Sequence, residues 1–268
     1  MKNSNNILKE KGNKALLYDF HTHVENIDEL ESYFDLNVIP IIDISNFHEW
    51  EILKKSDKWE KYSESINNNF YISVGVHPFD STPWSEKTEI FYNNMSKYSS
   101  FVGEIGMDSC WSNVDKSIQK SNFEKSLYFA YKNNFPVILH TKNMEGEIYD
   151  IIRKYSLRFI VHWYSCENYI DEYISLGCYF TFGPALLEDK NIRTLAKKVP
   201  LDKILIETDG LSALKWLYNK DVSENELRYY LEITIDEIAQ IKGISPRKMV
   251  DIVNTNSEFL LRKGDKNG

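Results

Sequence analysis

The sequence has few of the features that mark disulfide-bonded or membrane-spanning proteins. Its three cysteines, Cys110, Cys166 and Cys178, have no paired spacing, so we predict packing or incidental thiols rather than a disulfide framework or a zinc ribbon. No stretch approaches the roughly 20 apolar residues of a membrane span. The net charge of −8 lacks the basic excess that wide contact with duplex nucleic acid requires. It leaves open an enzyme that holds a few nucleotides through metal ions and local lysine or arginine residues.

The two ends of the chain are polar, and the part between them contains no recognisable linker. Residues 1–14 are rich in Asn and Lys without an apolar central segment. We therefore expect a disordered tail rather than a secretion signal, and a cytoplasmic protein. Residues 15–262 show no shift in composition and are predicted to form one domain, followed by a short tail at 263–268.

Short apolar runs rich in β-branched residues alternate with longer amphipathic segments. Several runs are almost continuously apolar, as expected of parallel strands buried on both faces. There are eight: Leu16–His23, Val38–Ser45, Tyr71–Pro78, Phe101–Asp108, Pro136–Lys142, Phe159–Tyr164, Cys178–Pro184 and Ile204–Gly210. Eight strands in about 250 residues, each followed by a helix, predict an α/β protein with a (β/α)8 TIM barrel. A doubly wound open sheet is the alternative that periodicity does not exclude.

Two of the predicted helices carry capping signals. In the segment 117–133, Ser121 and Glu124 have the spacing of a capping box, and aromatic and aliphatic residues recur every four positions. Ser223 and Glu226 repeat the capping-box spacing ahead of a later apolar pattern. Both segments are therefore predicted to be amphipathic helices that cover the sheet.

Histidines and carboxylates gather at the C-terminal ends of the predicted strands. Five of the six histidines lie there: His21, His23, His77, His140 and His162. Glu104 lies in the fourth run and Asp209 near the end of the eighth. In a barrel these ends open onto one face, where active sites are built. Four histidines with two carboxylates can hold two divalent metal ions. This mixed donor set suits Zn, Mn, Fe or Co and tolerates Mg.

Three further carboxylates share these strand ends. Asp19 lies two residues before His21, and Glu207 lies two residues before Asp209, so each shares a strand face with a candidate ligand. We expect Asp19 to orient a ligand. Glu207 either orients a ligand or is a hydrated acid inside the barrel. Asp108 either orients a neighbour or simply ends its strand.

Aromatic and basic residues next to these ends are candidates for substrate contact. Phe79, Trp111, Trp163 and Tyr164 follow strand ends, where their rings either stack on nucleotide bases or pack the loops. Lys142 lies two residues after His140 and is expected to contact a phosphate.

The ordered set of motifs resembles the TatD family of metal-dependent nucleases, in the amidohydrolase-like group of barrels. The resemblance runs from about residue 16 to 262. Its matching segments are Asp19-Phe20-His21-Thr22-His23, Gly75-Val76-His77-Pro78, Gly103-Glu104-Ile105-Gly106-Met107-Asp108, Pro136-Val137-Ile138-Leu139-His140-Thr141-Lys142, His162-Trp163-Tyr164-Ser165 and Glu207-Thr208-Asp209, with Gln119, Phe123 and Asn256.

This resemblance implies two bound metal ions that share Glu104 as a bridging ligand. The first ion would be held by His21, His23, Glu104 and Asp209, and the second by Glu104, His140 and His162. Lys142 stands where the family usually has an arginine, and His77 lies beside the site, so either could contact a phosphate.

The activity implied is hydrolysis of a DNA phosphodiester. Two metals would activate a water molecule, with Asp209 as both a ligand and the group that orients or deprotonates that water. The expected substrate is single-stranded DNA or a frayed end, shortened from its 3′ side by a monomeric enzyme. The segment after His23 is shorter than usual, and Gly210-Leu211-Ser212 replaces the common small-residue–Pro–Tyr run. Both departures reshape the rim around the substrate.

Three segments resemble a narrower subgroup, the TatD-like nucleases encoded with Qat antiphage defence systems. They are residues 162–165, 177–185 and 209–210. This resemblance implies a role in antiphage defence, with partner proteins from such a system. Two other readings stay open. One is a hydrolase of a small phosphate, ester or amide substrate on the same metal site. The other is a defence-complex subunit that is inactive or active only with its partners.

Overall fold

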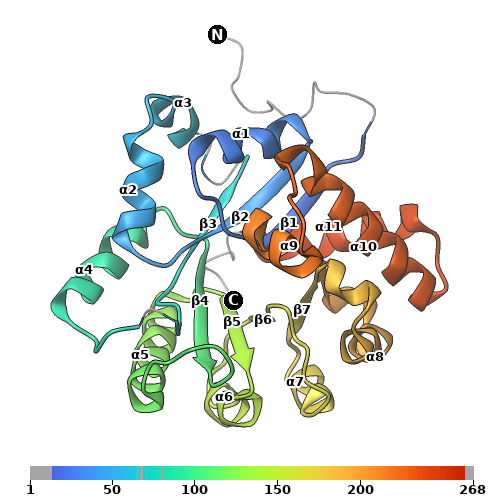
Figure 1. Ribbon diagram of the computed structural model, residues 1–268. Coiled ribbons are helices and arrows are strands. Elements are labelled where there is room, and N and C mark those ends of the chain that lie inside the picture. Colours follow the sequence, from blue (N-terminus) through green and yellow to red (C-terminus); the bar gives the residue numbers. More distant parts are fainter. Residues whose placement is uncertain (1–13, 65, 67–68, 80, 263–268) are drawn as a thin grey trace.

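Eight parallel strands form one sheet in sequential order, and helices surround it (Figure 1). The computed structural model describes residues 14–64, 66, 69–79 and 81–262, so the predicted tails at 1–14 and 263–268 lie outside the described residues, apart from Lys14. The strands are β1 (Leu17–Thr22), β2 (Val38–Ile44), β3 (Tyr71–Val74), β4 (Phe101–Asp108), β5 (Val137–Lys142), β6 (Phe159–Val161), β7 (Tyr179–Phe182) and β8 (Ile204–Ile206).

The helices follow the strands in the predicted alternation. They are α1 (Ile27–Asp35), α2 (Phe47–Lys55), α3 (Trp59–Ser63), α4 (Glu86–Met95), α5 (Lys116–Asn133), α6 (Glu145–Ile152), α7 (Ile170–Ser175), α8 (Lys190–Lys198), α9 (Gly210–Tyr218), α10 (Leu227–Lys242) and α11 (Pro246–Leu261), with 3-10 turns η1 (Pro184–Leu187), η2 (Leu201–Lys203) and η3 (Glu224–Glu226). Because the strand order never reverses, the fold is the predicted (β/α)8 barrel and not a doubly wound open sheet.

The barrel closes at a seam between β8 and β1. The backbone N–H of Asp209 donates to the carbonyl of His21 at 3.1 Å. The N–H of Thr208 donates to Asp19 Oδ1 at 2.8 Å, and the Thr208 hydroxyl donates to Asp19 Oδ2. A buried carboxylate on β1 therefore holds the segment that follows β8. Side chain and backbone together join the two ends of the sheet.

The helix predicted over 117–133 is confirmed as α5, although the capping-box spacing within it does not mark its start. Helix α5 begins at Lys116, because the Asp115 carboxylate accepts the N–H of Ser117 at 2.8 Å and caps the first turn. Ser121 and Glu124 therefore lie inside the helix, and their capping-box spacing does not mark its start. The box at Ser223 and Glu226 does form, although its first turn is the 3-10 turn η3 that leads into α10.

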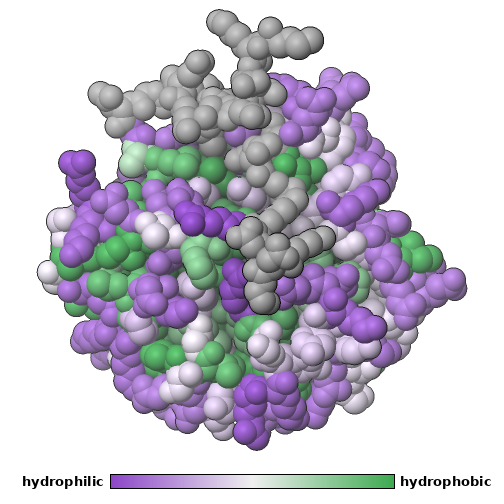
Figure 2. Space-filling view, turned by 180° about the vertical axis from the view of Figure 1, so that it is seen from behind, coloured by the Kyte–Doolittle hydropathy of each residue, from purple (hydrophilic) through white to green (hydrophobic). Residues whose placement is uncertain are grey.

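The strands are buried along their length. Every residue of β1, β2, β4 and β5 is buried, so these strands are covered on both faces, as their continuous apolar runs predict. The face turned away from the viewer in Figure 1 is hydrophilic over much of its area, with hydrophobic areas between (Figure 2). Among the described helices, none is both long and apolar enough to cross a membrane.

Arg228 ties helix α10 to the opposite end of the barrel from the histidines. Its buried guanidinium donates from Nη1 to the carbonyls of Leu36 (2.9 Å) and Asn37 (3.3 Å), and from Nη2 to that of Ala15 (2.9 Å). We expect Arg228→Met to lower the free energy of unfolding by about 2–4 kcal/mol, because the change leaves carbonyl groups without their donor. Urea unfolding measured by circular dichroism checks this value.

The matched control for this prediction is Arg247→Met, because Arg247 is exposed on α11. Its loss should change stability by less than about 0.5 kcal/mol. A similar small effect for Arg228→Met would show that water replaces the guanidinium.

Candidate metal centre

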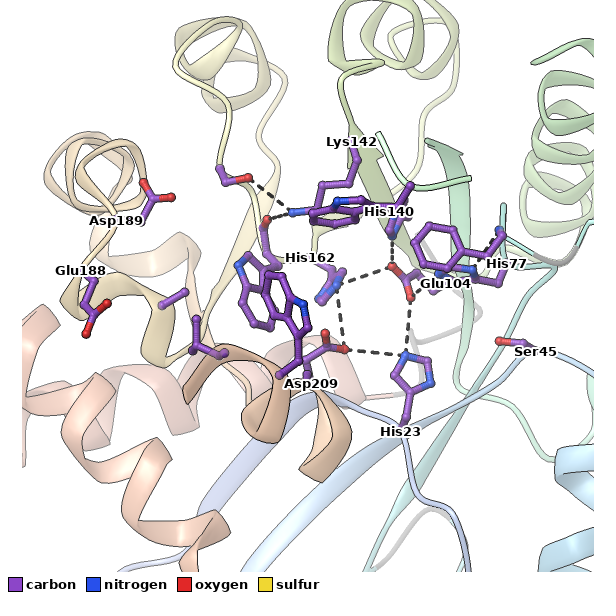
Figure 3. A pocket seen from close by; sticks show the side chains of 18 of the residues that line it. His23, Ser45, His77, Glu104, His140, Lys142, His162, Glu188, Asp189 and Asp209 are labelled. Atoms are coloured by element: carbon purple, nitrogen blue, oxygen red, sulfur yellow. Dashed lines mark hydrogen bonds and ion pairs between the residues drawn. The ribbon is translucent and has the colours of Figure 1, made fainter. Parts of the chain in front are cut away.

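Six acidic or imidazole side chains from five parts of the chain meet at the C-terminal end of the barrel, and Figure 3 labels all of them except His21. Apart from His21, they line a pocket of about 890 Å³. The predicted residues brought together here are His21, His23, Glu104, His140, His162 and Asp209, with His77 beside them. The strand-end pattern in the sequence therefore corresponds to one location in space.

Glu104 lies at the centre of this group. Its side chain is 1% exposed, and each carboxylate oxygen faces a different set of imidazoles. Oε2 faces the Nε2 atoms of His77, His21 and His23 at 3.3, 3.5 and 3.7 Å, while Oε1 faces His162 Nε2 at 3.5 Å and His140 Nδ1. A carboxylate divided in this way has the geometry of a bridging ligand.

Four contacts within the first set of predicted ligands have the spacing of metal ligands. Asp209 Oδ1 is 3.3 Å from His21 Nε2 and 3.6 Å from His23 Nε2. Together with Glu104 Oε2, these atoms give neighbour distances of 3.3–3.7 Å. Ligands 2.0–2.1 Å from a central ion in tetrahedral geometry lie about 3.4 Å apart. His21 Nε2 and Asp209 Oδ1 are also buried without a hydrogen-bond partner among the described residues. This donor set therefore fits a metal.

The second set is less compact. Glu104 Oε1 contacts both His140 and His162, but the closest three-residue groups pair His162 with His21 and Glu104, and His140 with His77 and Glu104. His140 Nδ1 is hydrogen-bonded directly to Glu104. The geometry thus supports a compact first position and a looser second one that shares the same carboxylate.

Two buried carboxylates orient the histidines of the second set. Asp108 Oδ2 is 2.8 Å from His140 Nε2, and Glu207 Oε2 is 2.8 Å from His162 Nδ1. In each imidazole the other nitrogen then faces Glu104. Glu207 Oε1 also accepts the N–H of Trp163 at 3.0 Å. This arrangement favours an orienting role for both carboxylates over a strand-ending or hydrated one, because such partners fix the ring and its tautomer.

Asp19 and Asp43 accept hydrogen bonds from backbone N–H groups and not from imidazoles. Asp19 bonds to Thr208 across the seam, and Tyr33 donates to it at 3.2 Å, so it supports the segment before Asp209 rather than a histidine. Asp43, which the motif argument missed, accepts the N–H of Glu104 and lies close to His23. The sequence did contain a signal for Asp43, because this residue follows the apolar run 38–42 of β2, just as the other site residues follow the apolar runs of their strands.

The segment after Asp209 turns sharply to bring its ligand inward. Asp209 and Gly210 have φ angles of +63° and +84°, and a Cβ on Gly210 would lie 2.5 Å from the carbonyl oxygen of His23. Only glycine avoids both the left-handed strain and this backbone contact. Helix α9 starts there, in the Gly210-Leu211-Ser212 region where the sequence departs from the common run.

The predicted substrate residues that line the pocket are His77, Phe79, Trp111, Lys142 and Trp163. Tyr164 is buried, and its hydroxyl donates to the carbonyl of Asn168, so this ring packs the loop instead. His77 Nδ1 accepts the N–H of Phe79 at 3.1 Å, so a neutral His77 carries its proton on Nε2 and directs a donor into the site. The buried Lys142 ammonium donates to the Trp163 carbonyl at 2.6 Å. Burial lowers the pKa of Lys142, although nearby carboxylates such as Asp209 oppose the shift.

Cys110, Cys166 and Cys178 are free thiols.

Carboxylates and imidazoles shift one another's pKa values. Burial works to raise the pKa of Glu104, but His162, His140 and His77 outweigh it and hold that pKa well below its ordinary value. Burial likewise works to lower the pKa of His23, but Glu104 and its neighbours raise it to about 9.

Metal binding should therefore release protons. His23 without metal is protonated at pH 7, because its pKa is about 9, whereas a ligand imidazole must be neutral. Apparent affinity for Mn²⁺ should rise between pH 6.5 and pH 9, by about tenfold per pH unit for each proton released. Calorimetric titration in buffers of different ionisation enthalpy counts these protons. An affinity independent of pH over this range would contradict the prediction.

Comparison with known proteins adds four findings. Residues 18–262 match the family model described as TatD related DNase. The chain is 23% identical over 261 residues to the uncharacterized metal-dependent hydrolase YabD of Bacillus subtilis, covering 92% of this chain and 99% of that one. It is 24% identical over 200 residues to the 3′-5′ ssDNA/RNA exonuclease TatD of Pectobacterium carotovorum, covering 71% and 77%. The crystal structure of a TatD family hydrolase from Entamoeba histolytica superposes with a TM-score of 0.73 at 17% identity, covering 91% and 97%.

Proposed function

Because the chain belongs to the TatD family of metal-dependent hydrolases, we propose that it is a nuclease that removes nucleotides from the 3′ end of single-stranded DNA. The observation that carries the proposal is the compact group of His21, His23, Glu104 and Asp209 atoms, with buried unpaired nitrogen and oxygen atoms facing one another. The exonuclease of Pectobacterium carotovorum supports the polymer substrate and the direction.

Two ions are proposed at this centre, with Glu104 between them. His21, His23 and Asp209 would complete the first position, and His140 and His162 the second. When bound, divalent ions there supply Lewis acidity for the phosphoryl group and bring the pKa of a water molecule down toward about 7. Asp108 and Glu207 hold the two histidine rings in the tautomers that leave the inward nitrogens available.

The remaining steps fall to side chains that line the pocket. Asp209 Oδ1 faces the imidazoles, and we assign its second carboxylate oxygen to accept the proton of the attacking water. Attack at phosphorus breaks the bond to the 3′ oxygen of the preceding nucleotide, which then needs a proton. His77 Nε2–H can donate a hydrogen bond to a phosphoryl oxygen, and the Lys142 ammonium can neutralise phosphate charge, while the leaving 3′ oxygen takes its proton from solvent water.

The test is a cleavage assay on 5′-labelled single-stranded and duplex DNA with Mg²⁺, Mn²⁺ or Zn²⁺, and an EDTA control. We expect a ladder shortened from the 3′ end, mononucleotide products, and slower cleavage of blunt duplex. His140→Ala should remove the activity, whereas His48→Ala should keep it, because His48 is exposed and outside the centre. Turnover of a simple phosphate ester without cleavage of any nucleic acid would replace this proposal by the small-substrate hydrolase.

We also propose a role in antiphage defence, on the resemblance of residues 162–165, 177–185 and 209–210 to Qat-associated nucleases. Cells that carry the chain with its neighbouring genes should give fewer plaques than cells that carry the His140→Ala variant. Equal plaque counts would remove this part of the proposal and leave the nuclease itself untouched.

A further inference from the structure

Tryptophan is concentrated at the pocket. Three of the six tryptophans line it, namely Trp111, Trp163 and Trp216. Trp111 and Trp216 are 56% and 67% exposed, and their ring centroids are 6.1 Å apart at an interplanar angle of 70°. Large aromatic rings are usually buried, so two indoles that meet in solvent at the edge of one pocket need an explanation.

Both exposed indoles are placed by residues of the metal centre. The backbone N–H of Trp111 donates to Asp108 Oδ1 at 2.7 Å, and the other oxygen of Asp108 bonds to His140. Trp216 lies on α9, whose N-cap is Asp209, and seven residues of helix place it about 10 Å further along the axis. The two rings lie 105 residues apart in the sequence. Trp111 is bonded to the carboxylate that orients His140, and Trp216 is on the helix that Asp209 caps. Their spacing from the reacting centre is therefore set by the fold.

The charges around the pocket limit what can bind. Lys142 Nζ lies 5.7 Å from the ring centroid of Trp111. Among the described residues that line the pocket, Lys142 is the only lysine or arginine. The lining also includes the carboxylates of Glu49, Glu188 and Asp189, of which Glu188 and Asp189 lie across the pocket from His77 (Figure 3). A groove that tracks a long backbone needs a row of cations. Among the described lining residues, this pocket offers one lysine and a set of flat rings.

We propose that Trp111 and Trp216 form a base-stacking subsite for the terminal nucleotide of a single strand. This inference rests on the proposed nuclease function and specifies its substrate as a strand end that is held by its base. The ring faces bind the base irrespective of its identity, because every base offers a π-face. Lys142 binds the adjoining phosphate. The carboxylates of the pocket lining repel the other phosphates, so the rest of the strand stays outside the pocket.

Two substrates that differ in one base test the subsite. One is a single strand with an ordinary 3′-terminal nucleotide, and the other ends in an abasic tetrahydrofuran nucleotide. We expect kcat/KM to be about tenfold to a hundredfold lower on the abasic end. Trp111→Ala and Trp216→Ala should lose a similar factor on the ordinary end and little more on the abasic end. Equal rates of the wild-type protein on both ends would overturn the subsite and leave the nuclease standing.

A binding measurement separates failure of the subsite from failure of catalysis. In EDTA, titration with dAMP should quench tryptophan fluorescence, and titration with deoxyribose 5-phosphate should not. Trp216→Ala should weaken the dAMP response about tenfold. The control is Tyr128→Ala, which removes a ring that is 55% exposed on α5 and outside the pocket lining. Unchanged dAMP quenching in both tryptophan variants would show that the rings only pack against each other.

Discussion

Glu104→Ala is expected to lower kcat/KM on single-stranded DNA by about a thousandfold or more. Loss of one group that stabilises charge at a reacting centre typically costs a hundredfold to a thousandfold. Glu104 contributes more than one such contact, because its two oxygens face five imidazoles and would bridge two ions. Its removal should take ligands from both positions at once.

Metal content provides the direct measurement for this variant. After dialysis, atomic emission should find the wild-type protein with more than one ion per chain and Glu104→Ala with fewer. Glu104→Gln keeps the side-chain shape and should show a similar loss, because an amide is a poor bridging ligand. The control is Glu172→Gln, an exposed residue of α7. Full metal content and activity in Glu104→Ala would rule out the bridging assignment.

Gly106→Ala is expected to damage both the barrel and the centre. Gly106 pairs with His140 between β4 and β5, and a Cβ there would lie 1.9 Å from the His140 carbonyl oxygen. The atoms it meets are backbone, so the two strands must separate. We expect a loss of at least about 3 kcal/mol in stability, beyond ordinary overpacking. His140 would also move away from Glu104 and Asp108, and metal binding would weaken.

Gly183→Ala is the matched control for this prediction. A Cβ on Gly183 would meet its nearest atom, the carbonyl oxygen of Glu207, at 3.4 Å, which is ordinary contact. Thermal unfolding in EDTA separates the two glycines without metal effects. Gly183→Ala should unfold near the wild-type temperature, and Gly106→Ala many degrees lower. Similar unfolding temperatures would mean that β4 and β5 can adjust to a methyl group.

The fold was predictable from the sequence because strand and helix patterns alternate along the whole chain, but the ends of several strands were not. The predicted runs 71–78, 159–164 and 204–210 continue past strands that end at Val74, Val161 and Ile206. After the last two strands, Trp163 and Asp209 adopt positive φ angles, which residue type alone does not reveal. Helix α9 was missed for the same reason.

The centre was predictable to the extent that its ligands follow strand ends in order. The contacts between elements were not, because they depend on side chains that reach across the sheet. Asp19 was expected beside the histidines and instead bonds to Thr208, 189 residues away. Asp43 on β2 supports Glu104 two strands away on β4, and Trp216 reaches Trp111 across 105 residues of sequence. Each of these contacts forms only in the closed barrel, so none of them could be predicted from the sequence.

The seam between β8 and β1 links the thermodynamics of folding to the chemistry. His21 and Asp209 stand on its two sides, joined by one backbone hydrogen bond of 3.1 Å. An ion held by both loses ligands whenever the seam opens, so mass action adds its binding free energy to the work of opening the barrel. Metal supply would then govern how often β8 detaches and how quickly the Asp209 amide exchanges with solvent. A cell short of metal would hold a protein that is both inactive and more open to proteolysis.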